Sequence, residues 1–270
     1  MNILVTLNSN YIKPLKVMLK SLFINNKSMF NIYIMHSNLS DDEILELEEF
    51  VTENGSSLFS AKVGDELFSE APVILHYTKE MYYRLLAFKV LPQELEKILY
   101  LDPDILVINS IEELYHIDIS EYLYAAAYHD RVSVKEVNRL RLYPYEIEEY
   151  FNSGVLLMNL PLLRDVVKEN EIYDFVDKNR NRLVLPDQDI INSLYSKQIR
   201  KLDEVIYNYD PRYYRYYKVI SKNSVDMDYI INNTSIIHFC GKKKPWNKNY
   251  SGEFHSLYKH YEKLTFRKNC

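Results

Sequence analysis

Residues 97–108, with the sequence KILYLDPDILVI, constrain the fold of this chain more than any other stretch. Two short apolar runs flank an Asp-Pro-Asp turn, a pattern typical of two buried strands. Residues i and i+2 of an extended segment point the same way, so Asp102 and Asp104 share one side while Pro103 keeps Asp102 extended. Two carboxylates that face one space suit a hard divalent cation, but they can also cap their own backbone. Both interpretations stay open at this point.

Composition limits the protein to a few classes. A chain of 270 residues with 47% hydrophobic content has room for one substantial α/β domain and is too apolar to be disordered. The net charge of −5 argues against a nucleic-acid binder, which needs a basic face. The two cysteines form no disulfide framework, the N-terminus lacks a signal-peptide pattern, and no apolar run reaches the ~18 residues of a membrane span. We therefore expect a cytoplasmic protein.

The N-terminal part alternates predicted strands and helices. Strands are expected near 3–7, 30–36 and 58–63. Helices are expected between them, and the second opens with a capping box of Ser40 and Glu43 and ends at Asn54-Gly55. This is a parallel βαβ series of nucleotide-binding type. No Gly-x-Gly-x-x-Gly or Gly-x-x-x-x-Gly-Lys follows the first strand, which excludes dinucleotide-binding and P-loop proteins.

Further elements are predicted towards the C-terminus. Helices are expected over 79–91, 162–179 and 186–196, strands over 122–129 and 235–239 and after the Asn152-Ser153-Gly154 turn, and a loop over 207–218. The last strand carries His238 and is followed by Gly241 and three lysines, so an imidazole and several cations leave the sheet at one point. A core histidine and an ordinary solvated lysine face are the alternative interpretations.

The order of these motifs resembles glycosyltransferase family 8, which comprises retaining enzymes with the GT-A fold. The matching segments are Val5-Thr6-Leu7 with Asn10-Tyr11, Arg84, residues 100–104, 151–157, 187–189 and 238–241, and Lys244-Pro245-Trp246. The resemblance implies an α/β chain with the GT-A nucleotide-diphospho-sugar transferase fold, a Rossmann-like mixed sheet flanked by helices, over residues 1–250. Residues 251–270 are expected to form a basic amphipathic helix that docks on the domain or touches a membrane peripherally.

The resemblance also implies a binding role for each matching residue. Asp102, Asp104 and His238 would bind Mn²⁺, or Mg²⁺, together with the diphosphate of a UDP-sugar. Asn8 departs from the family, because several bacterial members place an acidic residue there to accept the uracil N–H; an amide still accepts one bond, so uridine remains the favoured base. The implied donor-binding residues are Thr6, Leu7, Asn8, Tyr11, Arg84, Asp102, Pro103, Asp104, Asn152, Ser153, Gly154, Asp187, Gln188, His238, Gly241 and Lys244.

The implied catalytic residues are Gln188, Asp187 and Asp189. A double displacement needs a carboxylate nucleophile, and Gln188 is a poor one, so we expect attack on the face from which the leaving group departs. Asp189 and Asp130 are the carboxylates that keep a covalent route open. Acceptor-facing loops of the family correspond to His76, Asp130, Tyr213 and Tyr214, although these tyrosines can also simply pack or coat the surface.

The sequence therefore predicts a Mn²⁺-dependent, retaining hexosyltransferase. It would move glucose or galactose from UDP-glucose or UDP-galactose to a sugar or glycolipid acceptor of a cell-envelope or surface glycan, such as lipopolysaccharide. An alternative with the same chemistry attaches the sugar to protein. Two alternatives come from other classes: a catalytically weak nucleotide-sugar or carbohydrate-binding protein, which the intact metal motif disfavours, and a metal-dependent phosphohydrolase, for which the chain shows no evident base.

Overall fold

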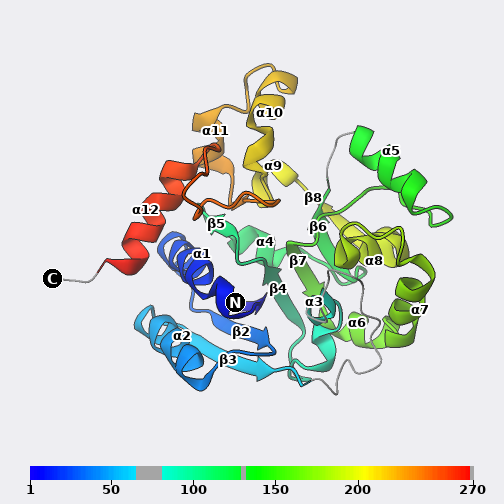
Figure 1. The fold of residues 1–270 in the computed structure, drawn as a ribbon, viewed down its shortest axis with the longest axis horizontal. Helices are drawn as coiled ribbons and strands as arrows, with labels where there is room; N and C mark the ends of the chain where they lie inside the picture. Colours follow the sequence, from blue (N-terminus) through cyan, green and yellow to red (C-terminus); the bar gives the residue numbers. More distant parts are fainter. Residues whose placement is uncertain (65–80, 129–131, 268–270) are drawn as a thin grey trace.

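A mixed sheet of seven strands forms the centre of the molecule (Figure 1). The computed structural model describes residues 1–64, 81–128 and 132–267. The strand order is β3-β2-β1-β4-β7-β6-β8, in which β7 runs antiparallel to both of its neighbours and the other pairs are parallel. The strands are β1 (Asn2–Thr6), β2 (Asn31–His36), β3 (Ser57–Lys62), β4 (Lys97–Leu101), β6 (Tyr124–Ala127), β7 (Val155–Asn159) and β8 (Ile199–Leu202). The predicted Rossmann-like mixed sheet is thereby confirmed.

Helices cover both faces of this sheet, so its central strands are apolar on both sides. Leu4 and Tyr100 point into one hydrophobic cluster, and their neighbours Val5 and Leu99 point into the other. The helices are α1 (Ile12–Asn25), α2 (Asp41–Glu53), α3 (Met81–Leu85), α4 (Glu112–His116), α5 (Val132–Arg141), α6 (Leu160–Val166), α7 (Glu169–Asn179), α8 (Pro186–Tyr195), α9 (Glu204–Tyr207), α10 (Tyr214–Ile220), α11 (Met227–Asn233) and α12 (His255–Phe266). Short 3₁₀ turns are η1 (Ser9–Tyr11), η2 (Ala87–Lys89), η3 (Ser196–Gln198) and η4 (Pro211–Tyr213).

A second, two-stranded sheet joins distant parts of the chain. It pairs β5 (Ile105–Val107) antiparallel with β9 (Ile236–His238), and the register sets Ile105 opposite His238. The segment Ile236–His238 therefore lies beside the Asp-Pro-Asp turn, although more than a hundred residues separate them in the sequence. This pairing is what positions the site described below.

The local signals at helix ends are confirmed. Ser40 and Glu43 form both hydrogen bonds of the predicted capping box at the start of α2. Gly55 follows the end of α2 with φ of +74°, a left-handed conformation that glycine adopts without steric cost. Pro186 occupies the first turn of α8, where its missing N–H is not needed.

Two of the predicted helices are interrupted by tertiary contacts. The helix expected over 79–91 is represented, in the part that the structure describes, by α3 and η2. Arg164 donates to the carbonyl oxygens of Phe88, Pro92, Gln93 and Leu95, so these groups are satisfied without helical N–H partners. The helix expected over 162–179 divides into α6 and α7, because Val167 is extended and buries its side chain in the core.

The prediction of a loop over 207–218 is wrong, because most of this segment is helical. Asp210 accepts a hydrogen bond from the backbone N–H of Arg212 and so caps η4, which leads directly into α10. On α10, Tyr217 is buried and its hydroxyl donates to Glu204 at 2.6 Å. Among the described residues of the segment 122–129, where a strand was expected, the strand is β6 alone.

The C-terminal helix α12 docks on its own domain. Tyr258 and Tyr261 are buried, and Asn25 of α1 donates to the Tyr261 hydroxyl at 2.8 Å. Its apolar face belongs to a cluster with Val17 and Ile237. The apolar side of α12, which the expected membrane contact would use, therefore faces the domain. Within the described ranges, none of the helices combines the length and apolarity that crossing a bilayer requires.

Candidate functional site

The two carboxylates of the Asp-Pro-Asp turn lie where β4 ends and β5 begins. The N–H of Asp102 donates to the carbonyl oxygen of Gly154 at 2.9 Å, which ties the turn to the start of β7. The N–H of Phe239 donates to the carbonyl oxygen of Asp104 at 3.0 Å, which ties it to the end of β9. Pro103 is buried between the two carboxylates. Backbone contacts on both sides therefore hold the turn against two other motifs.

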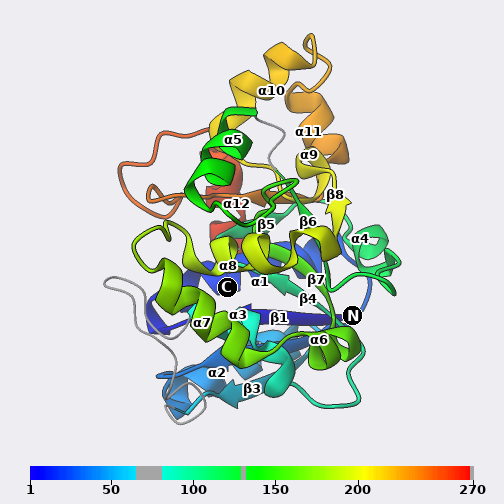
Figure 2. The ribbon, with the colours of Figure 1, turned by 90° about the vertical axis from the view of Figure 1, so that its right-hand side faces the viewer.

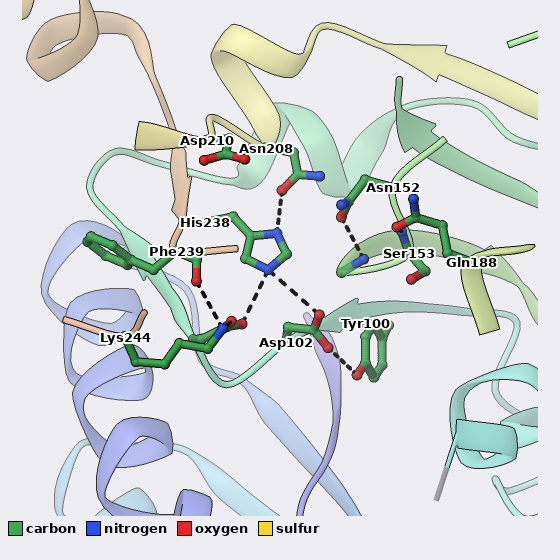
Figure 3. A network of polar contacts seen from close by, with 12 residues as sticks. Tyr100, Asp102, Asn152, Ser153, Gln188, Asn208, Asp210, His238, Phe239 and Lys244 are labelled. Atoms are coloured by element: carbon green, nitrogen blue, oxygen red, sulfur yellow. Dashed lines mark hydrogen bonds and ion pairs between the residues drawn. The ribbon is translucent and has the colours of Figure 1, made fainter. Parts of the chain in front are cut away.

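Asp102, Asp104 and His238 converge on one point. Figure 3 shows the His238 ring facing the Asp102 carboxylate. One ligand atom from each lies within 4.8 Å of the others. The Nε2 atom of His238 is 3.2 Å from Asp104 Oδ1 and 3.7 Å from Asp102 Oδ2. Its Nδ1 atom lies 2.8 Å from Oδ1 of Asn208, an oxygen that can only accept, so Nδ1 carries the proton. This bond orients the ring with Nε2 towards the carboxylates.

The residues present fit a divalent metal ion. Two carboxylate oxygens and one imidazole nitrogen form a donor set that suits Mn²⁺. Mg²⁺ also binds the carboxylate oxygens but binds the nitrogen less readily. Gly154 closes one side of the cluster, because a Cβ atom there would lie 2.2 Å from His238 Cε1 and 2.7 Å from Asp102 Oδ2. The three donors therefore face a space that only glycine leaves open.

Lys244 balances the charge of Asp104. Its ammonium group pairs with Asp104 and donates to the carbonyl oxygen of Phe239 at 3.0 Å. Burial by itself would raise the pKa of Asp104, but the charges and hydrogen bonds of His238 and Lys244 lower it well below its usual range. Burial would likewise lower the pKa of Lys244, but Asp104 raises it. A fixed positive charge is thus held beside the three donor residues.

Arg84 of α3 connects three of the predicted motifs. Its guanidinium lies 3.0 Å from Asp102 Oδ1 and 3.1 Å from Asp187 Oδ2, and it donates to the carbonyl oxygen of Ser153 at 3.1 Å. It also lies 4.5 Å from the ring centroid of Tyr100, whose hydroxyl donates to Asp102 at 2.5 Å. The position of Asp102 is therefore fixed by a cation and a phenol as well as by its backbone.

The first turn of α8 divides into two parts with different surroundings. Asp187 accepts a hydrogen bond from the Ser153 hydroxyl at 2.9 Å, and Gln188 accepts one from the Ser153 N–H at 3.3 Å. Asp189 is fully buried and accepts from Arg141 twice, from the Tyr150 hydroxyl and from two backbone N–H groups. Successive helical residues point about 100° apart, so Asp189 faces away from the side that Asp187 presents.

A cavity of about 450 Å³ lies in front of these residues. Its lining comprises Arg84, Asp102, Asp104, Asn138, Tyr150, Asn152, Ser153, Gly154, Leu185, Asp187, Gln188, Arg212, Tyr213, His238, Cys240, Gly241 and Lys244. Most of the predicted donor-binding residues are therefore brought together. Of the three predicted catalytic residues, Asp187 and Gln188 line the cavity and Asp189 does not.

The predicted base-binding residues lie beside the cavity, outside its lining. The Thr6 hydroxyl is 3.2 Å from the hydroxyl of Tyr100, which links it to Asp102. Asn8 accepts a hydrogen bond from the N–H of Asn10 and so caps η1, and Leu7 is buried. The rings of Tyr11 and Trp246 meet edge to face with centroids 6.0 Å apart. Thr6 ends β1, and Leu7, Asn8 and Tyr11 follow it at the same edge of the sheet as Asp102.

The predicted acceptor residues are divided. Tyr213 lines the cavity, whereas Tyr214 packs edge to face on Phe254, with centroids 6.4 Å apart, and is absent from the lining. His76 and Asp130 lie outside the described residues. The structure thus places one of these four residues at the cavity.

Several residues of the site were not predicted. Asn208 carries no motif of its own, and it reaches His238 because Tyr209 pairs with Ile237 beside it. Arg212 lines the cavity next to Tyr213 and lies against Gly241, where a Cβ would be 2.6 Å from its guanidinium. Gly241 has φ of +85°, a left-handed conformation in which any other residue would be strained.

Comparisons with known proteins identify the family of the chain. The model of the family described as "Glycosyl transferase family 8" matches residues 2–250. General stress protein A of Bacillus subtilis strain 168 is 27% identical over 278 residues, covering 98% of this chain and 94% of that protein. The lipopolysaccharide 1,2-glucosyltransferase of Escherichia coli strain K12 is 25% identical over 256 residues, covering 92% and 74%. A solved structure of galactosyltransferase LgtC in complex with donor and acceptor sugar analogs matches with a TM-score of 0.83 at 22% identity, covering 100% of this chain and 98% of that one, which shows a shared fold.

Proposed function

Because the chain belongs to glycosyl transferase family 8, we propose that it is a retaining hexosyltransferase that works in the cytoplasm. The donor is UDP-glucose or UDP-galactose, and the acceptor is a sugar or glycolipid of a cell-envelope or surface glycan. The relatives named above include a lipopolysaccharide glucosyltransferase, which supports this acceptor class.

One observation carries the donor assignment. Asp102, Asp104 and His238 meet beside Lys244 in the cavity, so three metal-donor groups and a fixed cation face the same space. The diphosphate of a nucleotide sugar brings two negative charges and oxygen ligands, which match this combination. A divalent ion held by the three residues, Mn²⁺ by preference, would supply electrostatic stabilisation of the diphosphate leaving group.

The residues of the chain supply the rest of the chemistry. As the bond between the anomeric carbon and the phosphate oxygen breaks, its electron pair moves to UDP, and the ammonium of Lys244 stabilises the new charge. The acceptor hydroxyl attacks the anomeric carbon on the face that UDP leaves, and its proton passes to the departing phosphate oxygen. Asp187 and Gln188 hold the sugar, while Asp189 holds the start of α8 by accepting from the N–H groups of Val184 and Leu185 and by pairing with Arg141.

Nucleotide binding is tested by thermal unfolding with UDP, GDP, CDP or ADP, each with and without Mn²⁺. A ligand at 100 times its Kd adds about 2.7 kcal/mol to the free energy of unfolding, which corresponds to roughly 5 to 10 °C for a domain of this size. We expect the largest shift with UDP and Mn²⁺ together. A larger shift with another nucleotide would show that uridine is the wrong base, and slow hydrolysis of the UDP-sugar without acceptor distinguishes an enzyme from a binding protein.

Gln188→Ala tests the same-face mechanism. A side chain that holds the sugar contributes to the rate without forming a bond, so we expect kcat to fall by about 10-fold to 100-fold and to stay measurable. Steady-state kinetics with the natural acceptor, or with water as acceptor, gives this number. A loss as large as that of the Asp104→Asn variant discussed below would instead indicate a covalent role for Gln188.

A further inference from the structure

Two helices project at the end of the molecule where the cavity opens. In Figure 1 and Figure 2, α5 and α10 both lie at the top, with α2 at the opposite end. Asn138 of α5 and Tyr213, directly before α10, line the cavity. One residue of α5 and the residue directly before α10 therefore border the cavity, and Tyr213 is one of the predicted acceptor residues.

The tip of α10 exposes apolar side chains. Val219 and Ile220 at its end are 74% and 56% exposed, and Tyr216 is also exposed. On α5, Leu140 is 79% exposed and Val137 is exposed as well. Single exposed apolar residues are common, but several at two neighbouring protrusions form a surface that water solvates poorly.

Cations without carboxylate partners surround the α10 tip. Arg215, Lys218 and Lys222 take part in none of the salt bridges found among the described residues. The sequence from 211 to 225 contains no acidic residue, although the chain as a whole carries a net charge of −5. The positive charge is therefore concentrated where the apolar side chains are exposed.

We propose that the α10 tip, residues 215–222, binds an anionic membrane surface. Apolar side chains at the apex with cations around them match the headgroup and acyl boundary of a bilayer that contains acidic lipids. The exposed apolar residues of α5, the other helix that borders the cavity, extend the same contact. The α10 tip would make this contact instead of α12, because the apolar face of α12 is packed against α1 and β9. Binding would direct the cavity towards acceptors held in the membrane.

An uncharged protein partner fits this surface less well. The three cations gain nothing from an apolar protein groove, whereas each basic residue close to acidic lipids strengthens binding by about fivefold. The membrane contact is independent of the sugar donor, so it stands or fails separately from the proposed transferase activity.

Vesicle sedimentation tests the proposal on the full chain. Vesicles of phosphatidylcholine with about one-third phosphatidylglycerol should bind the protein, whereas pure phosphatidylcholine vesicles should bind it at least tenfold less, and raised salt should release it. Val219→Asp with Ile220→Asp, and separately Arg215→Gln with Lys218→Gln and Lys222→Gln, should each weaken binding at least about tenfold. UDP-dependent thermal shifts of these variants should remain as in the wild type.

The matched control is Met29→Asp with Leu45→Asp, two exposed apolar residues near β2 and on α2, far from the tip. We expect this variant to bind vesicles as the wild type does. The proposal would be overturned if the Met29→Asp, Leu45→Asp control lost as much vesicle binding as the Val219→Asp, Ile220→Asp variant. Wild-type vesicle binding by the tip variants would also overturn it. So would a concentration-dependent dimer in sedimentation velocity that only the tip variant abolishes, because the surface would then serve a second copy of the chain.

Discussion

Asp104→Asn is expected to lower kcat/KM for sugar transfer by about 10³-fold, the loss of an electrostatic group that acts on developing charge. The substitution removes a charged donor from the proposed metal site and leaves the Lys244 ammonium without its carboxylate partner. Because asparagine keeps only one oxygen, an amide nitrogen would face either Lys244 or the Nε2 atom of His238, which lies 3.2 Å from Asp104 Oδ1. We therefore expect Mn²⁺ binding, measured by calorimetry, to be lost together with activity.

Asp226→Asn is the matched control for this variant. Asp226 caps α11 by accepting a hydrogen bond from the N–H of Tyr229, and asparagine caps helices equally well. Activity and metal binding should stay as in the wild type. If Asp104→Asn lost Mn²⁺ binding but kept its transfer rate, the metal would have no part in the reaction and the proposed role of the site would fail.

The sequence predicted the fold well where local rules decide it. The capping box of Ser40 and Glu43 and the turn at Gly55 set the limits of α2 through contacts within a few residues. The apolar runs around Asp102 are strands because both of their faces are buried. Helix interruptions were missed where packing decides them, as at Val167, which is extended and buried between α6 and α7.

The site was predictable only in part for the same reason. Local chemistry could not decide between a metal ligand and a backbone cap for Asp102 and Asp104, because the answer depends on the pairing of β5 with β9. The family resemblance supplied His238, but neither it nor the spacing indicated Asn208, whose partner lies 30 positions away. Asp189 directly follows Gln188 in the same motif, but its side chain points to another side of the helix and forms a buried ion pair with Arg141.

Gly154→Ala is the second substitution with a large expected effect, because it adds one carbon at the most crowded point of the site. The new Cβ would lie 2.2 Å from His238 Cε1, so either the imidazole or the start of β7 must move by about 1 Å. A displacement of that size at a catalytic constellation costs about 100-fold in rate. We expect kcat/KM to fall by this factor and Mn²⁺ affinity to fall with it.

Gly64→Ala separates this contact from the general cost of replacing glycine. A Cβ at Gly64 meets no atom of the described residues within 4 Å, and its backbone needs no left-handed conformation. Circular dichroism should show both variants folded, and only Gly154→Ala should lose activity. Should Gly154→Ala keep its Mn²⁺ affinity while it loses the rate, the added carbon would be displacing the donor sugar, and the close approach of Gly154 would serve substrate binding instead of the arrangement of Asp102 and His238.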